Sequence, residues 1–503
     1  MEKKVDLMSL QNGSDVRGIA VAGVTGEDVN LTADAVNRIA AGFAAFLAAK
    51  TGKAGSALKI AVGHDSRVSA ATMKHGVLSG LAAQGVQPFD CGLASTPAMF
   101  MSIVFAETAM DGAVMITASH LPFNRNGLKF FTADGGLEKD EITEVLRRAS
   151  DLSAGVADTS SVPQLAILDL YAAHLRRLIS GALGLDEAAE PLAGMHVVVD
   201  AGNGAGGFFA TAVLAPLGAD IAGSQFLDPD GTFPNHVPNP ENKEAMASVS
   251  RAVREAQGDL GLIFDTDVDR MSAVLSDGRE INRNALIAMM AAILAPLYPG
   301  STIVTDSVTS DELTVFLETH LGLKHHRYMR GYKNVINECR RLNGQGIVSP
   351  LAIETSGHGA LRENYYLDDG AYLAVKLLVA ATQAKRAGSS LDEIIAALKE
   401  PAESAEYRLR ITTREGVQAY GQEVLRIFAA RATAAGITLA EPSYEGVRLV
   451  FPKGWALLRM SLHDPNMPLN VESKERGGCA LIRRQLRPLL TGLAGLDTEV
   501  LQE

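Results

Sequence analysis

The chain has 503 residues, which is too long for a single compact core and predicts three or four domains. Hydrophobic residues make up 47% of it and charged residues 21%, proportions typical of a globular protein and not of a disordered or fibrous one. The formal net charge of -12 argues against a nucleic-acid or membrane partner, so an anionic substrate would need a locally basic pocket.

Short apolar stretches alternate with longer amphipathic ones along residues 1–155, a pattern typical of helices that cover a sheet. The first helix has a candidate cap at Thr32 and a stop at Gly52. The predicted elements of this segment are helices at 32–50 and 70–83 and strands at 58–62, 86–90 and 112–117. A stretch rich in Ser and Ala at 150–162 is typical of a linker.

The same alternation restarts twice further along the chain. The second segment contains predicted helices at 166–183 and 242–257 and strands at 196–200 and 260–264. The third contains predicted strands at 302–305 and 351–353 and helices at 310–321, 371–387 and 391–398. The longest apolar run, 285–295, ends at Pro296 and is too short to span a membrane, so we interpret it as a buried helix.

The C-terminal segment is ordered differently. A polar stretch at 400–406 leads to a strand at 407–412, a long helix, strands at 447–451 and 456–460 and a final helix. The predicted fold class is therefore α/β, with three similar domains built on mixed sheets and a smaller α+β domain at the C-terminus. We place the domains at 1–155, 156–300, 301–400 and 401–503.

The cysteines Cys91, Cys339 and Cys479 are widely spaced and form no CxxC pair, so neither a disulfide framework nor a thiolate zinc site is indicated. The first fifteen or so residues carry charges and no apolar stretch of the kind that a secretory signal contains. These features predict a cytoplasmic protein.

The most informative local pattern is Asp265-Thr-Asp267-Val-Asp269-Arg270, directly after a buried strand. Three converging carboxylates repel one another unless a cation offsets their charge, and an all-oxygen set suits Mg²⁺ or Ca²⁺ better than zinc. A calcium loop of the EF-hand type is excluded, because Arg270 and Ser276 stand where Gly and Glu are needed. The alternative is a solvated acidic turn.

A second pattern is Thr117-Ala-Ser119-His120-Leu-Pro122, which also follows a buried strand, with Lys129 shortly after it. A Ser exposed beside a His and ahead of a Lys is a candidate nucleophile or carrier of a phosphoryl group. The alternative is a Ser that forms a turn or caps a helix.

Two further patterns contain groups that suit a phosphosugar. In Glu354-Thr-Ser356-Gly357-His358, carboxylate, hydroxyl and imidazole groups could bracket the vicinal hydroxyls of a sugar. In Arg459-Met-Ser461-Leu-His463, a guanidinium fork and a hydroxyl could hold a phosphate. For each, an ordinary polar loop is an equally good interpretation.

Taken in order, these four segments resemble the α-D-phosphohexomutase superfamily, in particular its phosphoglucomutase/phosphomannomutase branch. The resemblance extends over nearly the whole chain and includes five minor motifs. They are Gly13-Ser-Asp15-Val-Arg17-Gly18, Gly63-His-Asp65-Ser-Arg67, Thr96-Pro97, Asp200-Ala-Gly202-Asn203-Gly204 and Asp230-Gly231-Thr-Phe-Pro234-Asn235-His236.

The resemblance implies four domains around a central cleft, each of which supplies one part of the site. The first supplies a phosphorylated serine, here Ser119, and the second a Mg²⁺ loop, here Asp265, Asp267 and Asp269, with the serine phosphate as a further ligand. The third contacts the sugar and the fourth holds the phosphate that is not transferred. The residues implied for the third domain are Gly331, Tyr332, Glu354, Ser356 and His358, and those for the fourth are Arg459, Ser461 and His463.

The implied activity interconverts hexose 1-phosphate and hexose 6-phosphate, with glucose or mannose as the sugar. A hexose 1,6-bisphosphate serves as intermediate and activator, and the protein is expected to act as a monomer or homodimer. Arg17, Lys129 and Arg270 would add positive charge around the serine phosphate. For the general acid/base we predict Lys333, with His120 as the rival; Lys333 could act as a base only with a depressed pKa.

The chain departs from the family pattern at the phosphate loop, which usually reads Arg-x-Ser-(Gly/Asn)-Thr-Glu-Pro. Leu462, His463 and Asp464 stand at the three positions before Pro465, so a hydroxyl is lost and a titratable donor is gained. Three other interpretations stay open: a phosphoglucosamine mutase, a phosphosugar-binding relative without turnover, and a haloacid-dehalogenase-type phosphatase with Asp265 as nucleophile.

Overall fold

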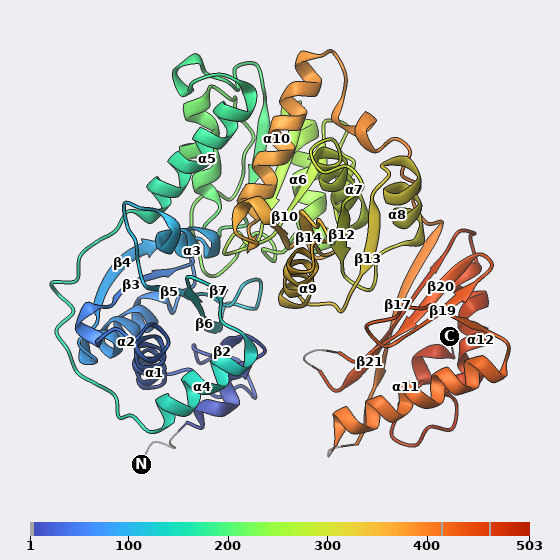
Figure 1. Ribbon diagram of the computed structural model, residues 1–503, viewed down its shortest axis with the longest axis horizontal. Helices are drawn as coiled ribbons and strands as arrows, with labels where there is room; N and C mark the ends of the chain where they lie inside the picture. The colour runs from blue at the N-terminus through green and yellow to red at the C-terminus, as the bar shows by residue number, and fades with distance from the viewer. Residues whose placement is uncertain (1–4, 414–415, 462–463, 503) are drawn as a thin grey trace. The chain divides into compact units, whose positions relative to one another are not determined.

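The computed structural model describes residues 5–413, 416–461 and 464–502 (Figure 1). Its chain divides into two compact units, the first made of Met1–Ile293 and Ser356–Ile394 and the second of Leu294–Thr355 and Ile395–Glu503. Among the described residues, no helix combines the length and the apolar character that crossing a bilayer requires.

The first unit begins with a mixed sheet of seven strands in the order β1-β2-β6-β5-β3-β4, with β7 paired to β6. Strand β3 runs parallel to β4 and β5, whereas β6 is antiparallel to β5 and β2. The strands are β1 (Gln11–Asn12), β2 (Asp15–Ile19), β3 (Lys59–His64), β4 (Gln87–Leu93), β5 (Gly112–Ile116), β6 (Arg125–Thr132) and β7 (Gly135–Gly136). The helices are α1 (Ala33–Thr51), α2 (Ala70–Ala83), α3 (Thr96–Val104) and α4 (Lys139–Ser150).

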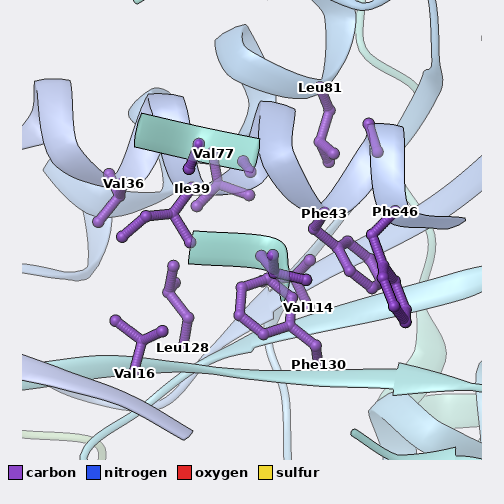
Figure 2. Packing of buried hydrophobic residues seen from close by; sticks show 14 of the residues in the cluster. Val16, Val36, Ile39, Phe43, Phe46, Val77, Leu81, Val114, Leu128 and Phe130 are labelled. Carbon is purple, nitrogen blue, oxygen red and sulfur yellow. The ribbon is translucent and has the colours of Figure 1, made fainter. Parts of the chain in front are cut away.

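Apolar side chains of α1 and α2 pack against this sheet and form its main core (Figure 2). Helix α1 begins after Thr32, whose hydroxyl accepts a hydrogen bond from Ala35 N, and ends at Gly52 in the left-handed region. Its apolar residues face Val114 and Phe130 of the sheet, and the rings of Phe43 and Phe130 lie 4.7 Å apart. This core fixes the strands whose ends carry the candidate site.

The helices of this core approach closely at two glycines. A Cβ atom on Gly80 of α2 would lie 2.2 Å from the carbonyl oxygen of Asn37 in α1. A Cβ on Gly42 of α1 would lie 2.6 Å from the carbonyl oxygen of Val145 in α4. Glycine is therefore required at both crossings, because a side chain would push the helices apart.

A second sheet in the first unit has the order β11-β10-β9-β8, with β8 and β9 parallel and the other pairs antiparallel. The strands are β8 (Val197–Asp200), β9 (Leu260–Phe264), β10 (Met271–Leu275) and β11 (Glu280–Ile281), and the helices are α5 (Ile167–Leu183), α6 (Lys243–Ala256) and α7 (Arg283–Leu294). The hairpin of β15 (Gly359–Leu361) and β16 (Leu367–Asp368) and helix α10 (Gly370–Arg386) complete the unit. The hydroxyl of Tyr171 in α5 donates to Asp369, the residue before α10.

The second unit contains a parallel group of strands in which β12 (Thr302–Thr305) pairs with both β13 (Lys324–Arg327) and β14 (Leu351–Ile353). Helices α8 (Asp311–Val315) and α9 (Tyr332–Gly344) connect these strands, and a π-helical turn at Phe316–His320 follows α8.

The C-terminal part of the second unit is an antiparallel sheet in the order β17-β21-β20-β19-β18 with two helices. Its strands are β17 (Glu403–Arg410), β18 (Thr438–Leu439), β19 (Val447–Phe451), β20 (Gly454–Leu458) and β21 (Asn466–Ser473), and its helices are α11 (Val417–Ala434) and α12 (Gly478–Leu490). This different C-terminal architecture and the mixed sheets before it confirm the predicted fold class.

Two sequence predictions near residue 400 are wrong. The α-helix predicted at 391–398 is only a 3₁₀ turn, Leu391–Ile395. The strand predicted at 407–412 begins too late, because β17 spans Glu403–Arg410 and already pairs with Ser473 at Glu403. Every second residue of β17 is exposed, and several of these residues are charged. The sequence of its first half therefore resembles that of a loop.

Candidate active site

Ser119 lies three residues beyond the end of β5, in a loop that turns the backbone sharply. Its φ of 50° lies in the left-handed region, which non-glycine residues adopt rarely and mostly at functional sites. The backbone N–H of Ser119 donates to the hydroxyl of Thr117 over 3.0 Å. The side chain of Ser119 is thereby turned out of the strand and left half-buried.

A buried arginine that the site prediction did not include holds this loop in place. The guanidinium of Arg67 donates to the carbonyl oxygens of Ser119 (2.5 Å), Leu121 (2.6 Å), Pro122 (2.7 Å) and Arg125 (3.0 Å). The sequence contained a signal for it, because Arg67 belongs to one of the minor motifs. Its partners, however, lie more than 50 positions further along the chain, and spacing alone does not show them.

The three aspartates of the acidic pattern lie at the end of β9 and are all buried. The oxygen Oδ2 of Asp265 lies 3.0 Å from Oγ of Ser119 and accepts its hydrogen bond. The loop between β9 and β10 is tight, with Val268 at a φ of 67°. Its backbone approaches Gly204 so closely that a Cβ there would lie 2.6 Å from the carbonyl oxygen of Thr266. The strand ends of both sheets therefore meet at Ser119 and Asp265.

Lys129 of β6 neutralises part of this acidic loop. Its ammonium donates to Oδ2 of Asp267 over 2.8 Å and to Oδ2 of Asp269 over 2.5 Å. Burial lowers the pKa of Lys129, but the two carboxylates outweigh it and raise that pKa well above its ordinary value. Thr96, a second residue that the site prediction omitted, donates its hydroxyl to Asp267 over 2.5 Å.

The aspartates themselves differ in their surroundings. Burial and the neighbouring charge of Asp269 raise the pKa of Asp265 well above its ordinary value. Burial also tends to raise the pKa of Asp267, but the charge of Lys129 and the hydrogen bonds from Lys129 and Thr96 outweigh it. The pKa of Asp267 is therefore held below its ordinary value. Asp267 is thus kept ionised more firmly than Asp265.

The acidic loop fits a divalent cation. Each of Asp265, Asp267 and Asp269 offers an oxygen atom within 4.8 Å of the others. The Oδ1 atoms of Asp267 and Asp269 are buried and have no hydrogen-bond partner among the described residues. Oxygen ligands that are buried, charged and unsatisfied suit a hard ion such as Mg²⁺.

Arg270 connects the acidic loop to the serine loop. Its Nη2 donates to Oγ of Ser119 (3.0 Å), to Oδ2 of Asp265 (3.1 Å) and to Nδ1 of His120 (2.6 Å). Since Nδ1 of His120 accepts this hydrogen bond, it carries no proton. Burial and the charge of Arg270 lower the pKa of His120 to about 2, so the ring is neutral near pH 7.

Three more of the predicted residues, Arg17, Ser356 and His358, lie in the first unit. Arg17 donates to the carbonyl oxygen of Thr117 over 2.7 Å and pairs with Asp15 over 2.8 Å. His358 makes a hydrogen bond of 2.9 Å with Ser356 through Nδ1, and its Nε2 lies 3.7 Å from Oδ1 of Asp269. The first unit thus brings together the serine loop, the acidic loop, Lys129, Arg270 and the Ser356–His358 pair.

The remaining predicted residues that the structure describes lie in the second unit. The backbone N–H of Gly331 donates to the buried carboxylate of Glu354 over 2.6 Å. Tyr332 and Lys333 form the first turn of α9, which has no side-chain cap. Glu354 therefore lies beside the loop that leads into α9, where the predicted acid/base Lys333 is located.

The phosphate loop follows β20. Arg459 is buried, its Nε has no hydrogen-bond partner among the described residues, and its Nη1 lies 3.8 Å from Oε1 of Glu445. The hydroxyl of Ser461 accepts a hydrogen bond from Asp464 N over 3.2 Å. His463 and Leu462 lie outside the described residues, so the predicted role of His463 stays a prediction.

Comparison with known proteins identifies the family. Models of the phosphoglucomutase/phosphomannomutase α/β/α domains I, II and III match residues 8–153, 170–278 and 282–401. A phosphomannomutase/phosphoglucomutase of Pseudomonas aeruginosa is 30% identical over 419 residues, which are 82% of this chain and 83% of the relative. A phosphoglucomutase of Neisseria gonorrhoeae is 27% identical over 446 residues, 88% of this chain and 91% of that one.

Among solved structures, a phosphoglucomutase/phosphomannomutase family protein from Burkholderia thailandensis has the same fold. It matches with a TM-score of 0.78 and 24% identity and covers 96% of this chain and 97% of its own. With its domain matches, its full-length relatives and its fold in agreement, the chain belongs to the phosphoglucomutase/phosphomannomutase family of the α-D-phosphohexomutases and is a hexose phosphate mutase, an isomerase.

Proposed function

We propose that this enzyme interconverts the 1-phosphate and 6-phosphate of glucose, mannose or both through a phosphoserine at Ser119 and a bisphosphorylated hexose. The observation that carries the proposal is the hydrogen bond of 3.0 Å between the hydroxyl of Ser119 and Asp265 of the acidic loop. A phosphoryl group on that hydroxyl would lie beside three carboxylates that suit a divalent cation and beside Arg270.

Asp265, Asp267 and Asp269 would hold Mg²⁺ together with an oxygen of the serine phosphate. Bound there, the ion would neutralise negative charge on the transferring phosphoryl group. Arg270 contributes a fixed positive charge at Oγ of Ser119, and Arg67 keeps the loop in the conformation that exposes this oxygen. Lys129 and Arg17 contribute further positive charge, which the transfer of a dianionic group requires.

The general acid/base that we propose is Lys333 at the start of α9. The rival, His120, is less suitable because its Nδ1 already accepts a hydrogen bond from Arg270 and because burial lowers its pKa to about 2. His120 is better placed to orient Arg270 over the serine oxygen.

The residues that we propose to contact the substrate are the ones that the sequence motifs predict. Gly331, Tyr332, Glu354, Ser356 and His358 would contact the hexose. Arg459, Ser461 and His463 would hold the phosphate that is not transferred, and the buried and partly unsatisfied guanidinium of Arg459 supports its assignment.

The proposal also includes four domains, a monomer or homodimer as the active form, and a cytoplasmic location. The domains are 1–155, 156–300, 301–400 and 401–503. The location is supported by Cys91, Cys339 and Cys479, which are free thiols. Phosphoglucosamine is the alternative substrate. A dehalogenase-type phosphatase is contradicted by membership of the mutase family.

The test is a coupled assay with Mg²⁺, a trace of hexose 1,6-bisphosphate and each hexose 1-phosphate in turn, glucosamine 1-phosphate included. Ser119→Ala should abolish turnover and the incorporation of phosphate into the protein. The control is Ser150→Ala, since that hydroxyl bonds to the carbonyl of Leu146 within α4. Wild-type turnover in Ser119→Ala would refute the phosphoserine route.

A further inference from the structure

A carboxylate of the second unit lies where an anionic ligand of Arg459 would be expected. Glu445, just before β19, places Oε1 3.8 Å from Nη1 of Arg459. Its Oε2 accepts hydrogen bonds from the backbone N–H of Arg330, over 3.1 Å, and from the hydroxyl of Ser307. One carboxylate thus receives a guanidinium, a backbone N–H and a hydroxyl from three separate segments.

These three donors are of the kinds that bind phosphate in proteins. The N–H of Arg330 lies immediately before the N-terminus of α9, a helix of 13 residues whose positive end favours anions. The backbone of the loop 330–331 already binds two carboxylates, those of Glu445 and Glu354. The backbone N–H groups of residues 330 and 331 therefore already bind anionic groups of the protein itself, the two glutamate carboxylates.

Arg459 is not satisfied by Glu445. At 3.8 Å the pair is an ion pair without a hydrogen bond. The Nε atom of Arg459 has no hydrogen-bond partner among the described residues, although the side chain is only 6% exposed. Burial lowers the pKa of Arg459, Glu445 raises it, and the charge of Arg330 lowers it again. A second guanidinium is thus near enough to act on the first.

We propose that Glu445 is an internal counter-anion that competes with the substrate phosphate for Arg459 and the N–H of Arg330, and so determines how tightly phosphate is held. The inference rests on the proposed role of Arg459 as the phosphate residue. A phosphate cannot share these donors with an ionised carboxylate without strong repulsion, so its entry requires Glu445 to move aside.

The competition has a consequence for turnover. In the proposed reaction each phosphate of the bisphosphorylated sugar occupies this position in turn, so the phosphate must be released as well as bound. When the phosphate leaves, the carboxylate of Glu445 returns to Arg459 and stabilises the site without phosphate. Glu445 thereby favours release of the phosphate. Removal of the charge of Glu445 should therefore lower KM without raising kcat.

The decisive variant is Glu445→Gln, whose amide oxygen still accepts from Ser307 and Arg330 but carries no charge. Isothermal titration of the whole protein with inorganic phosphate should show binding about tenfold tighter than in the wild type. The matched control is Glu472→Gln in the same unit. Glu472 is also a buried carboxylate, bonded to Ser310 and Trp455, and this change should leave phosphate affinity unchanged.

Phosphate affinity in Glu445→Gln equal to or weaker than that of the wild type would overturn the inference, and so would a failure of both proteins to bind phosphate. A thermal scan checks that the variant is folded. If the wild type lacks mutase activity but Glu445→Gln binds phosphate more tightly, the proposed function fails and the competition stands. If the wild type is active and the affinities are equal, only the competition fails.

Discussion

The hydroxyl oxygen of Ser119 and Oδ2 of Asp265 lie 3.0 Å apart, although the two residues are 146 positions apart in the sequence. Ser119 follows β5, a central strand of the first sheet, and Asp265 follows β9, a central strand of the second. Since both strands are completely buried, their cores fix where each loop begins, and contacts of Arg67 and Lys129 hold the two loops from there. Two independently packed sheets thus fix one reaction centre.

Asp267→Asn should impair metal binding and turnover together. The change keeps the shape of the side chain and removes one of three charges that would hold the cation. We expect turnover to fall roughly a hundredfold or more. We also expect Mg²⁺ to lose most of the stabilisation that it gives the wild type, as measured by thermal unfolding with and without the ion.

The control for this change is Asp277→Asn, because Asp277 is an exposed residue that pairs with Arg279 beyond the end of β10. It should behave like the wild type in both measurements. An undiminished Mg²⁺-dependent shift of Tm in Asp267→Asn would argue against the acidic loop as the metal site.

Arg67→Met should destabilise the protein and disorder the serine loop. It leaves the carbonyl oxygens of the loop 119–125 without their donor and removes the partner of Asp65 in a buried ion pair. Breaking a buried pair of this kind costs about 3–5 kcal/mol. Urea unfolding would measure the loss, and phosphate incorporation at Ser119 would measure the effect on the site.

Arg125→Met is the comparison for Arg67→Met. Arg125 pairs with Glu27 at the surface, where such pairs contribute about 0–1 kcal/mol. Arg67→Lys should restore only part of the stability, since an ammonium cannot reach four carbonyls in the way that a planar guanidinium does. Full rescue by Lys would mean that charge, and not geometry, is what the loop needs.

The sequence was sufficient to predict features that are local. Strand β9 and the acidic loop after it follow from an uninterrupted apolar run that ends in charged residues, and helix α2 follows from its periodicity; both have the predicted bounds. The place of Ser119 after a buried strand made it only a candidate, and the resemblance to the phosphohexomutases assigned it as the phosphorylated serine. The signals for β9, its loop and α2 are each contained within about fifteen residues.

The parts that could not be predicted depend on contacts between distant segments. Thr96 belongs to a minor motif, but nothing around it shows that its partner is Asp267, and nothing local predicts the pairing of Glu445 with Arg459. Strand β6 was not predicted because it contains Asn126, Gly127 and Lys129, residues with a low preference for strands. The strand forms here because it pairs with its neighbours in the sheet and because Lys129 bonds to the acidic loop. Tertiary context outweighed local preference at these positions.

Gly80→Ala should destabilise the first sheet domain. The added Cβ would meet the backbone of α1 at 2.2 Å, and backbone cannot yield as a side chain can. We expect a loss of about 1–3 kcal/mol in the free energy of unfolding.

Gly181→Ala in α5 is the matched control, because nothing lies within 4 Å of the added atom. Alanine favours helices, so this control should be neutral or gain about 0.5–1 kcal/mol. Similar free energies of unfolding for the two variants would show that α1 and α2 can move apart at this crossing without cost.

His236→Gln should lower stability in acid more than in alkali. Burial lowers the pKa of His236, but the hydrogen bond of 3.0 Å to Asp200 outweighs it, and the pKa in the folded protein is raised above 6.5. A raised histidine pKa contributes stability that is fully present below the unfolded value and is lost as the pH rises through the folded value. Gln can keep a hydrogen bond to Asp200 but cannot be charged. The difference in unfolding free energy between wild type and variant, measured by urea titration across the pH range, should therefore be largest below pH 6.5 and shrink above it. A difference that grows toward alkaline pH would mean that His236 is neutral when it contacts Asp200.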